Sequence, residues 1–301
     1  NNDGRQRYGR DGKAFAQRGA AVLRGAEVRE EHDGKGLREG RGEPQPSIER
    51  HEVDVVFNCA TKALNYSFVN PVNAFDTNVK GILNLLELQR KGKFATLCHF
   101  STSEVYGTAV YEPMDENHPK APTTTYAAGK AAADLALESY VNMFDVDAFI
   151  VRPFNNYGPR QNHKGFMAGI IPITARRILT GDASPEIHGG GTQSRDFIYI
   201  KDLLSIIDFM LQEQPESGFY NVGTGQARSF LDLAKQTFLA MGLSPDISFI
   251  DTPVDIRDNY QYFTEANLNK LRQAGYTKNF YSLEEGVQDY VQSYLTKNAY
   301  F

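Results

Sequence analysis

The chain has 301 residues, of which 41% are hydrophobic and 12% aromatic, so it can bury a sizeable core and wholesale disorder is excluded. Its net charge of -5 argues against nucleic acid or an anionic membrane as the main partner. Two cysteines cannot supply a disulfide framework or a cysteine-rich zinc site, and no apolar run approaches the roughly 18 to 20 residues of a membrane span. We therefore expect a cytoplasmic protein. His163 and His188 stand apart from other plausible ligands, so we expect no metal.

The first fifty residues differ in composition from the rest of the chain. About two in five are charged and glycine is dense, which is typical of poorly ordered sequence. From Val53 onward, apolar runs alternate with helical periodicity. We predict strands at 53–59, 94–100 and 146–151, and helices at 73–89 and 126–144. This alternation predicts a doubly wound, parallel, Rossmann-like α/β sheet, so residues 1–152 are assigned to a Rossmann-like domain whose segment 1–50 is atypical.

The pattern loosens beyond Pro153. Here we predict helices at 167–180, 201–212, 229–241, 265–274 and 283–295, and short strands near Ile187 and at 197–200, 218–222 and 247–250. Residues 153–301 are therefore expected to form mainly a smaller α/β substrate-binding lobe, with some strands and helices returning to the sheet.

Two short motifs point to chemistry. Tyr126 and Lys130 are four residues apart on a predicted helix, so they share one face. A lysine beside a tyrosine is expected to lower the pKa of the phenol, which makes the tyrosine a usable base near neutral pH. Residues 101–107 directly follow a predicted buried strand, so their hydroxyls lie at the carboxyl end of the sheet, where open α/β folds bind ligands.

At this point the sequence resembles a known family, the extended short-chain dehydrogenases that modify nucleotide sugars. The resemblance runs from about Asp54 to the C-terminus and rests on several motifs in the same order. These are DVVFNCA (54–60), DTNVKG (76–81), STSEVYG (101–107), YAAGK (126–130), RPFNNYGPR (152–160), RDFIY (195–199) and NVGTG (221–225).

The resemblance implies that NAD transiently oxidises a sugar at carbon 4. Tyr126 would remove the hydroxyl proton, Thr102 would hydrogen-bond the same oxygen, and Lys130 would grip the nicotinamide ribose. The cofactor-binding residues it implies are Cys59, Ala60, Asn78, Ser101, Tyr126, Lys130 and Phe154. The substrate diphosphate would be held by Asn155, Arg195 and Arg257, although Arg195 could equally pair with the neighbouring Asp196.

The choice of reaction depends on two further residues. Glu104 resembles the base of the 4,6-dehydratases and of the UDP-glucuronate decarboxylases, which favours dehydration. Ser103 stands where the dTDP-glucose type of dehydratase has an aspartate, which puts that subtype in doubt. In contrast, residues 158–168 resemble ADP-heptose 6-epimerases, in which the lysine at Lys164 is a second acid/base. We rank a 4,6-dehydratase narrowly above an epimerase. The epimerase could be of the ADP-heptose 6-epimerase type or a UDP-sugar 4-epimerase.

The N-terminus departs from the family. Gly9 and Gly12 keep two glycines of the loop that cradles the NAD pyrophosphate, and Asp33 faintly matches the ribose-binding acid, but no apolar strand precedes them. Three explanations of this segment remain open. It is a degraded Rossmann start, an altered N-terminus on an ordinary enzyme, or the sign of a non-catalytic nucleotide-sugar-binding protein. We favour the second. A homodimer through the helices at 73–89 and 126–144 is expected from the family.

Overall fold

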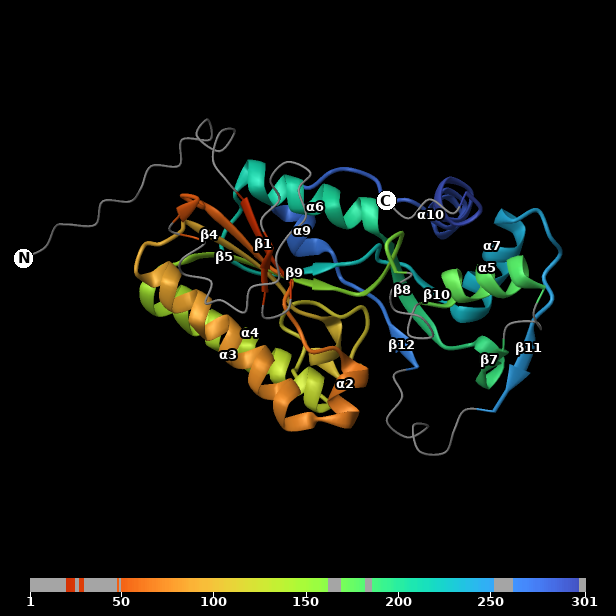
Figure 1. Ribbon diagram of the computed structural model, residues 1–301, viewed down its shortest axis with the longest axis horizontal. Coiled ribbons are helices and arrows are strands. Elements are labelled where there is room, and N and C mark those ends of the chain that lie inside the picture. Colours follow the sequence, from red (N-terminus) through yellow and green to blue (C-terminus); the bar gives the residue numbers. More distant parts are fainter. Residues whose placement is uncertain are drawn as a thin grey trace, which may run out of the picture.

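A six-stranded sheet forms the centre of the larger lobe (Figure 1). The computed structural model describes residues 20–24, 27–29, 48, 50–161, 169–181, 186–251 and 262–297. The strands lie in the order β2–β1–β3–β4–β5–β9. Their bounds are β1 Ala20–Arg24, β2 Glu27–Arg29, β3 Val55–Asn58, β4 Thr96–Phe100, β5 Asp147–Pro153 and β9 Gly218–Val222. The Rossmann-like α/β fold class predicted from the sequence is confirmed.

One edge of this sheet differs from the prediction. From β1 to β9 the pairings are parallel, but β2 runs antiparallel to β1. Two residues separate these strands in the sequence, and a parallel partner needs a crossover of a dozen or more residues. The first fifty residues therefore contribute a strand beside β3 that composition alone did not predict.

Helices cover both faces of the sheet (Figure 1). On one face lie α2 (Leu64–Val69), α3 (Pro71–Arg90) and α4 (Thr125–Phe144), and on the other α6 (Ile200–Glu213) and α9 (Asn269–Gln273). Leu85, Leu86 and Leu137 fill the first interface, while Phe149, Ile206 and Leu271 lie in the second. No helix among these described segments is long and apolar enough to cross a bilayer.

The two helices α3 and α4 approach each other closely at a glycine. A Cβ added to Gly129 would lie 3.3 Å from the Cα of Phe75 and 3.5 Å from the Cβ of Asn78. Gly129 lies between the tyrosine and the lysine of the predicted pair, so the small residues of this motif serve packing.

A smaller lobe lies beyond the carboxyl ends of the strands, on the right of Figure 1. Its elements are β6 Asn155–Tyr157, α5 Ile170–Thr180, β7 Glu186–His188, β8 Ser194–Tyr199, β10 Ala227–Ser229, α7 Phe230–Ala240, β11 Ser248–Ile250, β12 Phe263–Thr264, α10 Leu283–Tyr290 and the π-turn Val291–Leu295. β8 pairs with β6, β10 and β12, and Phe197, Leu233 and Val287 belong to the core of this lobe.

Candidate active site

The candidate active site begins where β4 ends. Thr102 leaves the strand, and its Oγ1 accepts a hydrogen bond from the Glu104 amide at 3.2 Å, which starts the short 3₁₀ helix η2 (Ser103–Tyr106). Gly107 follows at a φ of 66°, and a Cβ there would lie 2.0 Å from the carbonyl oxygen of Ala121. Local geometry therefore fixes the segment that carries Thr102 and Glu104.

The predicted tyrosine–lysine pair lies on the first two turns of α4. Thr124 caps the helix, its Oγ1 accepting from the Ala127 amide at 3.1 Å, so Tyr126 lies in the first turn. Lys130 is 3% exposed, and its ammonium donates to the carbonyl oxygen of Phe100 at 2.6 Å. Because Phe100 is the last residue of β4, this bond brings the two predicted motifs together at the end of that strand.

The pKa of Tyr126 moves in the direction opposite to our prediction. Burial raises the pKa of this phenol to about 12, hydrogen bonds with Thr102 and Thr61 lower it, and the carboxylates of Glu104 and Asp134 raise it further. Sequence spacing placed Lys130 on the same helix face but did not reveal that the phenol is desolvated. The prediction of a lowered pKa is therefore wrong for the protein alone.

Two other ionisable groups of the site are also perturbed by burial. Burial lowers the pKa of Lys130 to about 8, while Asp134 and Cys59 act in the opposite direction. Burial raises the pKa of Glu104, and the Arg195 guanidinium opposes that shift. A carboxyl whose pKa is raised is suited to taking and releasing a proton, while the lowered pKa of Lys130 reflects the cost of burying its charge.

The end of β3 carries residues that suit one end of a dinucleotide. Cys59 is exposed, and Asn78 fixes the loop that follows it, accepting from the Lys62 amide at 2.8 Å and from the Thr61 hydroxyl at 3.1 Å. An ammonium has three donors, and in the described part of the chain Phe100 is the one acceptor of Lys130. Two N–H groups are thus left for ribose hydroxyls, so these residues fit the nicotinamide end of NAD.

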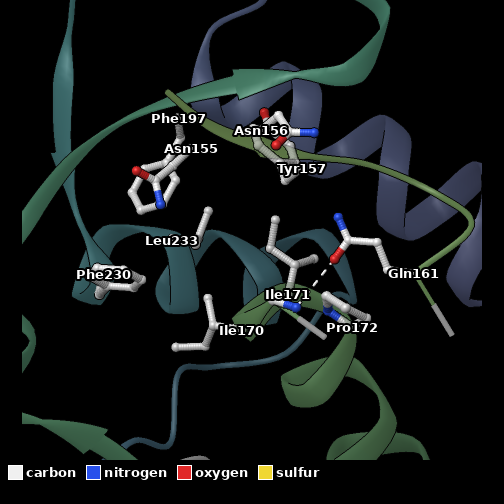
Figure 2. Close-up of a pocket in the computed structure, with 11 residues that line it drawn as sticks. Asn155, Asn156, Tyr157, Gln161, Ile170, Ile171, Pro172, Phe197, Phe230 and Leu233 are labelled. Atoms are coloured by element: carbon white, nitrogen blue, oxygen red, sulfur yellow. Dashed lines mark hydrogen bonds between the residues drawn. The ribbon is translucent and has the colours of Figure 1, made fainter. Parts of the chain in front are cut away.

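A pocket lies in the smaller lobe (Figure 2). Asn155 and Gln161 present amides to it, and Phe197 and Phe230 supply aromatic wall (Figure 2). Arg195 lies next to this pocket, its guanidinium 5.8 Å from the centre of the Phe230 ring. The same guanidinium lowers the pKa of Glu104, so Arg195 is near enough to η2 as well as to the pocket to act on both.

Asp196 is not the partner of Arg195. Its carboxylate accepts from the backbone amides of Thr224, Gly225 and Ala266 at 2.7, 2.9 and 3.1 Å. The aspartate therefore organises the loop after β9, and the alternative of an Arg195–Asp196 ion pair is wrong.

The remaining predicted residues fall into three groups. Ser101 and Ser103 are buried at the end of β4, and Ala60 donates its amide to Asn58 Oδ1 at 3.2 Å. The Phe154 side chain is buried in a hydrophobic cluster beside η2, so only its backbone could face a ligand. Five predicted residues lie outside the described part of the chain: Gly9, Gly12, Asp33, Lys164 and Arg257.

Sequence reasoning missed two residues that the structure brings to the site. Thr61 contacts the Tyr126 phenol, and Asp134 acts on both Tyr126 and Lys130. Asp134 follows Lys130 by four residues, the same spacing that identified the pair, so helical periodicity could have found it. No comparable signal marks Thr61, because it lies in a loop.

A parallel Rossmann-like sheet with a tyrosine–lysine pair at the end of a central strand agrees with the resemblance to the extended short-chain dehydrogenases. The model of the NAD dependent epimerase/dehydratase family matches residues 36–223, and the chain belongs to that family. This membership confirms the family resemblance and NAD as the cofactor.

Individual relatives include both epimerases and dehydratases. An ADP-L-glycero-D-manno-heptose-6-epimerase of Fusobacterium nucleatum is 45% identical over 156 residues, which cover 48% of this chain and 47% of the relative. The chain thus spans about half the length of this relative.

Among solved structures, the UDP-N-acetylglucosamine 4-epimerase of Methanobrevibacter ruminantium superposes with a TM-score of 0.76 at 26% identity, covering 84% of this chain and 79% of that one. The NAD complex of dTDP-glucose 4,6-dehydratase from Bacillus anthracis superposes with a TM-score of 0.72 at 26% identity, covering 85% of this chain and 77% of that one. The fold is therefore shared by both reaction types.

Proposed function

We propose that this protein modifies a nucleotide sugar by transiently oxidising one of its hydroxyl groups. The observation that carries the proposal is the meeting of Thr102, Tyr126 and Lys130 at the end of β4. NAD, when bound, accepts a hydride from the sugar carbon and later returns it. The protein's own part is to move the hydroxyl proton and to hold the sugar in place.

Each residue has a distinct role in this proposal. Tyr126, as its phenolate, takes the hydroxyl proton as the carbonyl forms and gives it back when the hydride returns; the Lys130 ammonium and the positive charge that oxidised NAD would bring stabilise that phenolate. Thr102, whose hydroxyl acts to lower the pKa of Tyr126, donates to the same sugar oxygen. Lys130 keeps a positive charge below the phenol and binds ribose hydroxyls with the two N–H groups that Phe100 leaves.

The pocket of the smaller lobe is proposed to bind the nucleotide. Asn155 and Arg195 would hold the diphosphate, because amide and guanidinium N–H groups are suited to phosphate oxygens. Phe197 and Phe230, which pack edge to face with ring centroids 5.3 Å apart, offer aromatic surface against which a base could lie. Arg195 would then place the sugar next to Glu104 and Tyr126.

Within this class, we propose epimerisation of an ADP-activated heptose as the first candidate reaction. The support is the 45% identity to an enzyme named as an ADP-heptose 6-epimerase. Lys164 is then the second acid/base, as the sequence resemblance implies. Dehydration at carbons 4 and 6 is the second candidate, because Glu104 is a partly buried carboxyl beside the phenol, as a proton-abstracting base requires.

Product analysis separates the candidates. The purified protein is incubated with NAD and either ADP-glycero-manno-heptose, GDP-mannose, dTDP-glucose or UDP-N-acetylglucosamine, and the product is examined by mass spectrometry and NMR. An epimerase gives a product of unchanged mass with an inverted carbon, whereas a dehydratase gives a ketone lighter by one water.

Two variants then identify the second acid/base. If the enzyme is an epimerase, Lys164→Met should abolish epimerisation and spare hydride transfer. If it is a dehydratase, Glu104→Gln should abolish dehydration and spare hydride transfer. Tyr126→Phe should abolish both reactions. No product from any of these sugars, together with no NAD binding by calorimetry, would refute the proposed function.

A further inference from the structure

Asp134 lies on α4 one helical turn after Lys130, the proposed catalytic lysine. Residues four apart on a helix share a face, and both side chains are buried, at 3% exposed for Lys130 and 0% for Asp134. A buried ammonium is unstable as an ion unless an anion or several hydrogen bonds compensate its lost hydration. Lys130 has a single hydrogen bond, to the Phe100 carbonyl, among the described residues.

The Asp134 carboxylate is held in one orientation by Arg152 of β5. Arg152 Nε donates a hydrogen bond to Oδ2 of Asp134 at 3.0 Å, and Nη2 lies 2.9 Å from the same oxygen as an ion pair without completing a hydrogen bond. Arg152 is itself fixed, because its Nη1 donates to the Tyr106 hydroxyl at 3.0 Å, and that hydroxyl donates to Asn221 Oδ1 at 2.6 Å. This buried network extends from α4 to the edge strand β9.

The second carboxylate oxygen of Asp134, Oδ1, has no hydrogen-bond partner among the described residues. Oδ1 of Asp134 is buried and lies beside the equally buried Ser101 hydroxyl, but the two do not complete a well-formed hydrogen bond. Burial raises the pKa of Asp134, but the Arg152 guanidinium opposes that shift and stabilises the carboxylate, whose charge acts on Lys130.

We propose that Asp134 is a positioning residue that keeps Lys130 an ammonium ion below Tyr126 at neutral pH, with Arg152 fixing the carboxylate. This inference rests on the proposed function, since it assigns Asp134 a role in catalysis through Lys130. Asp134 and Arg152 would thus act on catalysis without touching the cofactor or the sugar themselves.

The other groups around Lys130 do not replace Asp134. His99 on β4 is held neutral, because burial and then Lys130 lower its pKa, and its Nδ1 lies 3.0 Å from the Asn58 amide nitrogen. Cys59, after β3, raises the pKa of Lys130, but less than Asp134 does. Without Asp134, burial would therefore lower the pKa of Lys130 further than it does now, toward loss of the proton.

Asp134→Asn tests the proposal, because an amide fits the same site. The Nε hydrogen bond and the close Nη2 contact of Arg152 both involve one oxygen, so the single amide oxygen can take its place while the NH₂ group faces Ser101. The protonation of Lys130 is followed directly in protein labelled with ¹³C at lysine Cε, by the chemical shift of that carbon against pH. The Lys130 resonance is the one that Lys130→Met removes.

The proposal predicts that Asp134→Asn lowers the titration midpoint of Lys130 by about one pH unit or more, and moves the alkaline limb of the kcat profile down by the same amount. Glu138→Gln is the matched control. It removes a carboxylate one turn further along α4, whose partner Lys120 lies 3.7 Å away, and it should leave both midpoints unchanged.

Asp134→Asn leaves Arg152 as a buried cation, so the variant could fail to fold. The double variant Asp134→Asn with Arg152→Gln removes both charges and should show the same lowered midpoint, because Asp134, and not Arg152, is a charge that shifts Lys130. An unchanged Lys130 midpoint in a folded variant would overturn the proposal. A lowered midpoint in a protein that never turns over a nucleotide sugar would instead support the Asp134–Lys130 coupling and refute the proposed function.

Discussion

Replacing Lys130 with methionine should change how stability depends on pH. The usual pKa of a lysine is 10.5, and burial lowers that of Lys130 to about 8 in the folded protein. Between these values the unfolded chain still binds a proton that the folded protein has lost, so the free energy of unfolding rises with pH. Below pH 8 both states are protonated, and the folded protein bears the full cost of a buried charge.

The magnitude follows from this difference. A lowering of about 2.5 in pKa, at 1.36 kcal/mol for each unit, corresponds to about 3 kcal/mol of folding free energy at pH 7. Methionine has a similar length and no charge, so Lys130→Met removes this cost. It also removes the bond to the Phe100 carbonyl, a charged hydrogen bond worth about 1.5 to 3 kcal/mol. The two effects roughly cancel at pH 7, and the change with pH isolates the charge.

Urea unfolding of the NAD-free protein at pH 7, 8, 9 and 9.5 measures this change. Between pH 8 and 9.5, the free energy of unfolding of the wild type should rise by about 2 kcal/mol relative to that of Lys130→Met, at 1.36 kcal/mol per pH unit. Lys80→Met, at an exposed lysine of α3, is the control and should show no such slope. A constant difference between wild type and Lys130→Met across this range would show that Lys130 is not a desolvated ammonium, and the electrostatic account of the site would fail.

Further predictions concern α3 and α4. If the chain forms a dimer through their outer faces, Leu135→Glu should give a monomer by light scattering, while Leu204→Glu on α6 should not, although the two leucines are 53% and 55% exposed. Gly129→Ala should destabilise the protein by up to about 2 kcal/mol in urea unfolding, since crowding against Phe75 outweighs the gain in helix propensity. Gly81→Ala, with no atom within 4 Å of the added Cβ, should instead stabilise α3 by up to about 1 kcal/mol.

The sequence predicts the larger lobe well because its elements are long and strongly periodic. The helices expected at 73–89 and 126–144 are Pro71–Arg90 and Thr125–Phe144, and the strand expected at 218–222 is Gly218–Val222. Periodicity reports burial, which is what determines these elements. It fails at Ala20–Arg24, because that strand lies in a charged, glycine-rich tract whose composition is typical of disorder.

Arg195 and Asp196 show where sequence patterns stop being informative about a site. Adjacent residues of opposite charge suggest an ion pair, yet they lie on strand β8, where successive side chains point to opposite faces. Asp196 therefore meets the backbone amides of the loop after β9, and Arg195 meets the face that carries Phe230 and Glu104. Alternation alone could have excluded the ion pair. It could not have supplied the partners, because both come from segments far away in the sequence, and their approach depends on how the smaller lobe packs against the end of β4.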